Sequence, residues 1–343
     1  MPFGALLPRL SLHLLLGVML PALASLSAAA DEVLEQGRSS RDVKTTRGQI
    51  VDYDGRNLTI IIGTGQEKTI PTSKILEVRP AWTDAMAQAE SLFAQGDYAG
   101  AIDAYRTAGQ AADKAWIRRH ILARLTRCYH NTGRPELACA AFSSLVDSDA
   151  QTIHFGDIPL NWTAEQPTPA LEQQAAAWLA SPKSAVQALL GASWLGSLAV
   201  KRTEAQRTLQ SLAANPDSRI SLLATAQLWR YQWPTANEEE IARFAASIDR
   251  LPPDLRGGSY YLLGRALVRQ KKPQEAALAL LRAPVLHADQ QAIASDALRL
   301  AAQQFEGLGQ TEEAASLYRE LINHYKTSPM AAEAQTRLQL LEK

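Results

Sequence analysis

The chain of 343 residues has no excess of charge of either sign and few cysteines. Lysine and arginine total 35, aspartate and glutamate also total 35, and these four types make up only 20% of the sequence. This balance argues against the basic surface of a typical nucleic-acid-binding protein, and the composition does not support a disordered chain. The two cysteines, Cys128 and Cys139, are too few for a disulfide scaffold.

Sequence motifs of common catalytic and metal sites are also absent. The string from Gly191 to Gly196 lacks the Gly-x-Ser-x-Gly spacing of a nucleophile elbow and lies in a predicted helix. Cys128 and His130 are two residues apart on a predicted helix, so they face different directions, and no His-Glu-x-x-His pair occurs. Residues 52–55 and 63–68 lack the remaining features of a calcium loop and a phosphate loop. We therefore predict no enzymatic activity, no cofactor and no metal site.

Residues 1–30 have the layout of a secretory signal peptide. A single charge, Arg9, precedes an apolar run from Leu10 to Leu26, and small residues follow as far as Ala30. The run is short for a permanent membrane anchor, although retention as an anchor stays open. We expect cleavage after Ala30, export to the periplasm or envelope of a bacterium, and no stable transmembrane segment in the mature chain.

Alanine divides the rest of the chain into two regions, with none in residues 31–80 and 52 in residues 81–343. The first region instead has short runs of β-branched residues separated by turn residues, which predicts three or four strands. The glycine and apolar positions that define this pattern are Gly48, Ile50, Gly55, Leu58, Ile60, Ile70 and Ile75. They resemble the pattern of a small SH3-like or Sm-like barrel. About 50 residues form a marginal core, so this module is expected to pack on the helical region or on a second copy.

The alanine-rich region has apolar residues at helical spacing and an internal repeat. The first unit has Ala89 and Leu92 on one predicted helix, a turn at Gly96, and Ala101 and Tyr105 on a second helix. The same register recurs three times, with turns at Gly133, Lys271 and Gly309. It resembles the tetratricopeptide repeat, a helix hairpin of about 34 residues. The resemblance implies a mainly α fold, a solenoid of antiparallel helix hairpins preceded by the small β module.

Between these units the repeat signal weakens. Trp194 and Trp229 are 35 residues apart, with Leu209 and Phe244 each 15 residues further on, which suggests two degenerate hairpins. The proline-containing stretch before them is predicted to be a connection that acts as a hinge or packs across the array. The expected segments are a signal peptide (1–30), a β module (31–80), repeats (81–150), a connection (151–169), degenerate repeats (170–255), and repeats with a capping helix (256–343).

The resemblance also implies candidate partner-binding residues, because the first helix of each hairpin lines the concave surface of such arrays. These positions are His120, Arg127, His130, Asn131, Tyr261, Arg265, Arg269 and Arg299. The set would suit an extended acidic peptide or a chain carboxylate, although ordinary solvated helix positions remain an alternative. Cys128 and Cys139 fall on the inward sides of the two helices of one hairpin, so they are either a possible disulfide or two small buried residues.

The resemblance implies a binding scaffold for a protein or peptide partner in the bacterial envelope. One alternative is a structural component that self-associates as a homo-oligomer. Another is a glycan-binding protein or enzyme that uses Trp162, the tryptophan of the connection.

Overall fold

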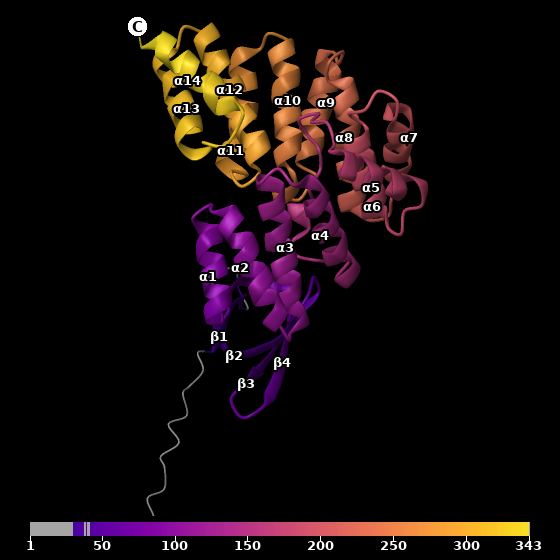
Figure 1. Cartoon of the computed structure of the whole chain (residues 1–343), viewed down its shortest axis with the longest axis vertical. Coiled ribbons are helices and arrows are strands. Elements are labelled where there is room, and N and C mark those ends of the chain that lie inside the picture. Colours follow the sequence, from indigo (N-terminus) through magenta and orange to yellow (C-terminus); the bar gives the residue numbers. More distant parts are fainter. Residues whose placement is uncertain (1–29, 38, 40–41, 343) are drawn as a thin grey trace, which may run out of the picture.

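The structure is a computed structural model and describes residues 30–37, 39 and 42–342. The predicted signal peptide lies outside these residues except for Ala30. In the described part, five strands precede fourteen α-helices (Figure 1). A mainly helical fold with a small β-rich module in front is therefore confirmed.

The strands form one antiparallel sheet in the order β4-β3-β2-β1-β5. Their bounds are β1 Asp31–Gln36, β2 Val43–Tyr53, β3 Asn57–Ile62, β4 Gln66–Pro71 and β5 Ile75–Arg79. The long strand β2 pairs with β1 through residues 43–48 and with β3 from Gln49 onward. Gly48 lies where the partner changes, and a Cβ atom there would lie 2.1 Å from the carbonyl oxygen of Ile61. Only glycine allows this close approach.

The sheet packs on the helical region. Its buried residues share a core cluster with Trp116 of helix α3 (Ala115–Asn131). Lys114, directly before α3, donates to the carbonyl oxygen of Ile50 at 2.8 Å. A module of this size gains the apolar contacts it lacks from the neighbouring helices. The likeness to an SH3-like or Sm-like barrel stays a prediction.

Four helix pairs have turns of the same geometry at the predicted positions. The pairs are α1 (Asp84–Ala94) with α2 (Tyr98–Ala111), α3 with α4 (Pro135–Ser148), α10 (Gly257–Arg269) with α11 (Pro273–Leu286), and α12 (Gln291–Gly307) with α13 (Thr311–His324). Gly96, Gly133, Lys271 and Gly309 all have positive φ angles. In each turn the following N–H donates to a carbonyl five residues earlier, at 2.9–3.1 Å, which is the Schellman ending of a helix.

The middle of the array is built from helices with other turns. Its elements are α5 (Pro169–Ala180), α6 (Ala185–Leu195), α7 (Arg202–Leu212), α8 (Ser218–Gln232) and α9 (Glu238–Ile248). Trp194 and Leu209 lie on α6 and α7, and Trp229 on α8 stacks against Phe244 on α9 with ring centroids 3.9 Å apart. The aromatic spacing of the sequence thus marks successive helices. The last helix, α14 (Met330–Leu341), packs on the final hairpin through Ala334 and Leu338.

The connection between α4 and α5 packs inside the array. Phe155, Ile158, Leu160 and Trp162 all belong to the largest core cluster. The carbonyl oxygen of Pro159 accepts a hydrogen bond from Trp194 Nε1 at 2.9 Å. Of the two roles considered for this segment, packing across the array is the one that these contacts support.

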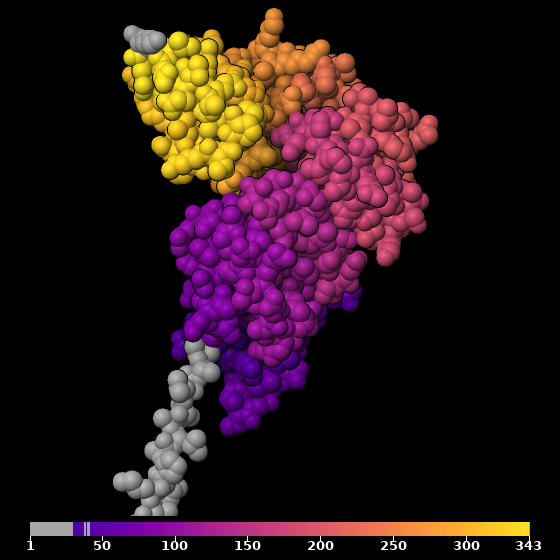
Figure 2. Space-filling model, in the orientation of Figure 1, coloured from indigo at the N-terminus to yellow at the C-terminus, as the bar shows by residue number. Residues whose placement is uncertain are grey.

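The array curves so that its N-terminal and C-terminal hairpins approach each other. Helices α1–α4 and α10–α14 lie on opposite sides of a hollow that is visible at the edge of the molecule (Figures 1 and 2). Arg127 Nη1 of α3 lies 3.3 Å from Asp289 Oδ2 in the turn between α11 and α12. Asn131 Nδ2 donates to the carbonyl oxygen of Asp289 at 3.0 Å. These contacts join parts of the chain that are far apart in sequence.

Candidate functional site

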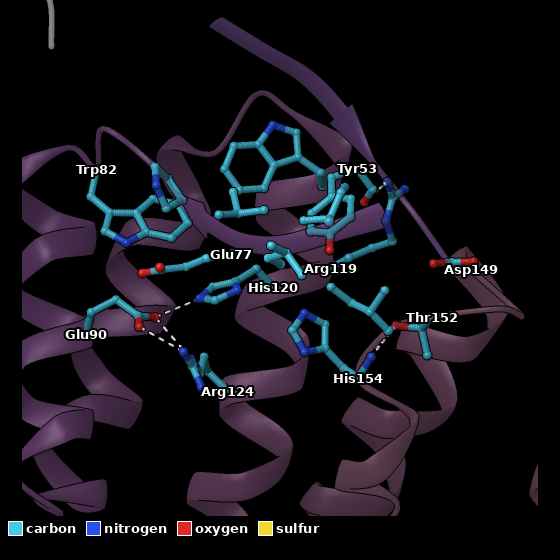
Figure 3. A pocket seen from close by; sticks show the side chains of 16 residues that line it. Tyr53, Glu77, Trp82, Glu90, Arg119, His120, Arg124, Asp149, Thr152 and His154 are labelled. Atoms are coloured by element: carbon cyan, nitrogen blue, oxygen red, sulfur yellow. Dashed lines mark hydrogen bonds and ion pairs between the residues drawn. The ribbon is translucent and has the colours of Figure 1, made fainter. Parts of the chain in front are cut away.

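A pocket of about 320 Å³ lies where the sheet meets the first helices (Figure 3). Strand β5 and the segment that follows it form one wall, and helices α1 and α3 form another. Residues 149–154, which lead out of α4, close the far side. The site therefore depends on the sheet and the repeats being packed together.

A carboxylate with four hydrogen bonds lies at one end of this pocket. Glu90 of α1 accepts from Tyr105 Oη at 2.6 Å and from Arg124 Nη2 and Nε at 3.0 and 3.2 Å, and it bonds His120 Nε2 at 2.7 Å. Burial acts to raise the pKa of Glu90. The hydrogen bonds from His120 and Tyr105, together with the charges of His120 and Arg124, lower this pKa to about 2. Glu90 is thus ionised and its charge is balanced by its neighbours.

Aromatic rings cover the side of the pocket next to this carboxylate. The ring of Trp82 lies 5.5 Å from that of Trp116 and 5.1 Å from that of His120, measured between centroids. His154 meets His120 edge-on at 5.7 Å. Burial lowers the pKa of His154 to about 3, so this imidazole is uncharged near neutral pH. The rings offer apolar faces to a ligand.

The other charged groups of the pocket also have partners. Arg119 pairs with Asp52 and donates to the carbonyl oxygen of Tyr53 at 2.9 Å. Asp149 accepts from two backbone N–H groups, at 2.9 and 3.0 Å, and Glu77 pairs with Arg79 at 2.8 Å. Each carboxylate and guanidinium here thus makes at least one contact, while the buried Arg119 Nε and Trp116 Nε1 have no hydrogen-bond partner among the described residues.

Glu90 orients His120 in the pocket, and the lining residues include neither serine nor cysteine. Across the described residues, no group of three or more His, Cys, Asp or Glu is placed to hold a metal ion. The arrangement is suited to binding.

The N-terminal members of the predicted partner-binding set lie in different environments. His120 lines the pocket described above. Arg127 lines a separate pocket of about 240 Å³, where it pairs with Asp157 and Asp289. His130 is half-buried, and the desolvation of its ring lowers its pKa to about 4, while Asn131 donates to the backbone carbonyl of Asp289.

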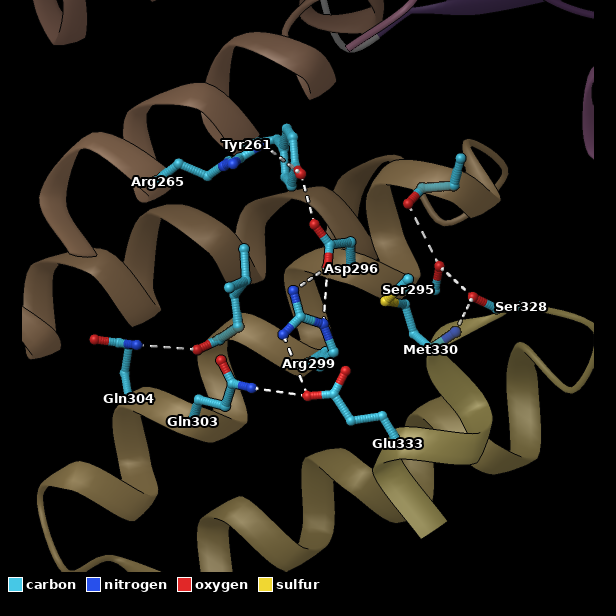
Figure 4. Close-up of polar contacts among 12 residues, drawn as sticks. Tyr261, Arg265, Ser295, Asp296, Arg299, Gln303, Gln304, Ser328, Met330 and Glu333 are labelled. Atoms are coloured by element: carbon cyan, nitrogen blue, oxygen red, sulfur yellow. Dashed lines mark hydrogen bonds and ion pairs between the residues drawn. The ribbon is translucent and has the colours of Figure 1, made fainter. Parts of the chain in front are cut away.

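The C-terminal members form a polar network of their own (Figure 4). Tyr261 is buried and donates to Asp296 at 2.5 Å, and Arg299 Nε donates to the same carboxylate at 2.9 Å. Arg265 Nη1 donates to Tyr261 Oη at 3.2 Å, whereas the side chain of Arg269 is exposed. The structure therefore does not gather the eight residues into one basic surface, because neighbouring carboxylates neutralise several of them.

Of the two alternatives for Cys128 and Cys139, the structure has two buried residues and no disulfide. Both thiols are free and buried. Cys128 packs in the cluster of α1 and α2, while Cys139 packs in the large central cluster, where its sulfur lies 3.9 Å from the carbonyl oxygen of Pro159. The two side chains point into different cores, which the repeat register alone did not distinguish.

The alternative in which Trp162 contacts a ligand is not favoured by its position. Its side chain is only 7% exposed, and its ring lies against Gly258 of α10. A Cβ atom at Gly258 would lie 2.0 Å from the indole. The ring therefore serves packing and is covered by protein.

Sequence reasoning identified His120 but not the other residues of the pocket. Trp82 and Glu90 lie far from His120 in sequence, and only the packing of α1 against α3 brings them together. One local signal exists, since His120 and Arg124 are four residues apart and share a helix face. A single sequence gave no sign that Glu90 would be their common partner.

Comparisons with known proteins identify the repeat at one place in the chain. Residues 296–328, from α12 through α13, match the family model of the tetratricopeptide repeat. This finding confirms the predicted repeat type for the final hairpin. No curated protein matches the chain.

Two solved structures show the extent of similarity to known folds. The TPR domain of P58(IPK) is 16% identical to this chain, with a TM-score of 0.26. The match covers 75% of this chain and 63% of that chain, which is less than two thirds of the other chain's length. The C-terminal part of a TPR repeat-containing protein from Cytophaga hutchinsonii is 16% identical, with a TM-score of 0.28, and the match covers 74% of this chain and 94% of that one.

Proposed function

We propose that the chain is a non-enzymatic scaffold that binds a protein or peptide partner. The observation that carries this proposal is the pocket between the sheet and the first hairpins, with its aromatic rings and internally paired charges. Packed helix hairpins hold such a site in a fixed shape, so less conformational entropy is lost when a partner docks.

Binding at this pocket is favoured over binding across the predicted concave surface. The connection fills part of the interior, with Leu160 and Trp162 in the central core. Arg127 and Arg299 are each paired with carboxylates, which reduces their attraction for an acidic peptide. Of the predicted set, His120 is the residue that lines the proposed site.

Export to a bacterial envelope is part of the proposal. It is supported by the signal-like sequence of residues 1–30 and by the position of β1, which begins at Asp31, directly after the expected cleavage point. The carboxylate of Asp31 accepts from the N–H groups of Ile50 and Ala81, both at 2.7 Å, so the fold is anchored at this residue. Among the described helices, none is both long and apolar enough to span a bilayer. Cell fractionation with N-terminal sequencing tests the proposal, which fails if the protein stays in the cytoplasm with residue 1 intact.

Self-association is a second candidate, favoured by exposed apolar side chains on α11. Leu278 and Val285 are 68% and 74% exposed. If these residues form a contact between copies, the mass of the purified chain rises with concentration and Leu278→Lys with Val285→Lys abolishes the rise. A mass that stays that of a monomer at high concentration removes this candidate.

Crosslinking mass spectrometry on native envelopes tests the scaffold proposal. Lys74 is exposed directly before β5 and reports on the pocket, whereas Lys271 and Lys326 are exposed on the C-terminal hairpins. We expect crosslinks to a second protein at Lys74. Crosslinks only between copies of the chain, or to a partner only at Lys271 and Lys326, would contradict binding at the pocket.

A further inference from the structure

We propose that the pocket binds an extended polypeptide that adds to strand β5 and inserts an apolar side chain between the aromatic rings. This inference rests on the proposed scaffold function and specifies how the partner is recognised. Its evidence is the open edge of the sheet, the position of the pocket along that edge, and the balance of charge inside it.

The outer edge of β5 is unpaired in the part of the chain that the structure describes. The strand is last in the sheet order and pairs with β1 alone, in a register that joins Val78 to Val33. Every second residue of an edge strand directs its N–H and C=O groups away from the sheet. Such a row of donors and acceptors is a template for one more strand.

The pocket runs along this edge. Four consecutive residues, Ile75 to Val78, all line it. Because β5 is the outermost strand of the sheet, a pocket bordered by this run of its residues lies next to the sheet edge. A chain paired with β5 would therefore have side chains directly beside the pocket.

The other edge of the sheet is protected in ways that β5 is not. Strand β4 ends in Pro71, which has no N–H to donate. Lys68 of β4 also places a charge there, paired with Glu35. Strand β5 contains no proline, its two charged residues Glu77 and Arg79 pair with each other at 2.8 Å, and Leu76 is 56% exposed. Proline and charged side chains are the usual means of blocking unwanted strand addition.

The inserted side chain should be apolar. Leu76 and Ile153 are exposed apolar residues of the pocket, and Trp82 adds an aromatic face beside them. Glu90, Glu77 and Arg119 are already in ion pairs, so an incoming charge would lose its hydration and compete with these existing pairs. A volume of about 320 Å³ is at the lower end for ligand pockets and suits one large side chain better than a whole small-molecule ligand.

The test begins with peptides selected from a random library on the mature chain, residues 31–343. Each selected peptide is synthesised with one N-methyl group at a time along its backbone, and its affinity is measured by isothermal titration. Strand addition predicts an alternating pattern, because only every second N–H of the peptide faces β5. Loss of a hydrogen bond that is buried on docking should weaken binding about tenfold or more at those positions.

Matched leucine variants locate the site. Leu76→Lys places a charge at the pocket, and Leu340→Lys makes the same change at a similarly exposed leucine on α14. We expect the first variant to weaken binding about tenfold and the second to leave it unchanged, since roughly half a leucine side chain is buried on docking. Unfolding curves of both variants confirm that they remain folded.

The outcomes separate this inference from the function on which it rests. Alternating N-methyl sensitivity together with loss of binding in Leu76→Lys supports strand addition. Peptides or protein partners that bind equally well to Leu76→Lys, or that tolerate N-methyl groups at all positions, overturn strand addition while the scaffold function stands. If no peptide is selected and crosslinking finds no partner, both strand addition and the scaffold function are wrong. If β5 is crosslinked to a second copy of this chain, the occupant is that copy rather than another protein, and the proposal is overturned.

Discussion

Lys271 occupies a backbone conformation that the equivalent turns give to glycine. Its φ angle is 57°, against 68° to 76° for the glycines at the ends of α1, α3 and α12. A side chain in this left-handed region costs about 1–2 kcal/mol, while glycine loses more entropy on folding. Lys271 adopts this conformation because the hydrogen bonds of the Schellman ending require a positive φ angle, whichever residue is at this position.

We therefore expect Lys271→Gly to stabilise the protein by about 0.5 kcal/mol, the difference between these two effects. Its counterpart, Gly309→Ala, should destabilise by about 1 kcal/mol because alanine enters the same conformation. Urea unfolding measures both. A loss of stability in Lys271→Gly would show that the exposed lysine makes a stabilising contact that outweighs its strain.

The carboxylate of Glu90 makes the stability of the pocket depend on pH. Its pKa is lowered from 4.5 to about 2, so ionisation favours the folded state. This contribution is complete above pH 4.5 and is lost as the pH falls toward 2. After allowance for solvent screening, Glu90→Gln should cost about 1–2 kcal/mol at neutral pH and much less near pH 3. Unfolding curves at both pH values test this, with the exposed Glu312→Gln as control; an equal loss at both would refute the assignment.

Individual residues could be predicted where a local rule decides their conformation. The four turn positions followed from repeat register, and their φ angles agree. The paired state of Arg127 could not be predicted, because Asp157 and Asp289 come from a connection and a distant turn. For the same reason, the carboxylates that neutralise several residues of the predicted basic set could not be predicted from the sequence.

At the scale of elements, the connection makes a close contact with α10. The ring of Trp162 lies against Gly258, in space that a Cβ atom would occupy. Apolar residues without helical or strand periodicity marked this segment only as a loop in the sequence. Their burial arises because α6 and α10 present Trp194 and Gly258 toward the interior, which depends on the tertiary arrangement.

Gly258→Ala should destabilise the protein by about 1–3 kcal/mol, through overlap of the new methyl group with the indole. Trp162→Ala should cost about 3–5 kcal/mol, and in that background Gly258→Ala should add little, because the overlap is gone. The double-mutant cycle is measured by urea unfolding. Gly307→Ala is the control, since nothing lies near its Cβ position and a modest gain is expected. Additive effects of the first two changes would contradict the proposed contact.

At the scale of the whole molecule, the array is closed by contacts between helix α3 and the turn that joins α11 to α12. Asp289 accepts from Asn131 through its backbone and pairs with Arg127 through its side chain. The repeat pattern predicted a solenoid. The class of fold was predictable because the same register of small and apolar residues recurs in four hairpins. It did not predict how far the array curves, because the weakly patterned helices α5–α9 set its path.

Removal of this closing contact should loosen the array. Spin labels at the exposed positions Gln95→Cys and Lys326→Cys lie on the first and last hairpins. The distance distribution between them should broaden when Asp289→Ala is added, and it should respond to salt in the same direction because the ion pair is partly exposed. Asp249→Ala, at an exposed aspartate in another ion pair, is the control. An unchanged distribution would mean that helix packing alone fixes the curvature.

The central claim is that a partner docks at the junction of the sheet and the first hairpins. Hydrogen exchange of the mature chain, alone and with the partner recovered by crosslinking, tests it most directly. The account predicts slower exchange in Ile75 to Val78 and around Trp82 when the partner is bound. Slower exchange confined to helices α10 and α12, with exchange in β5 unchanged, would contradict the claim. The partner would then bind on the concave face of the array.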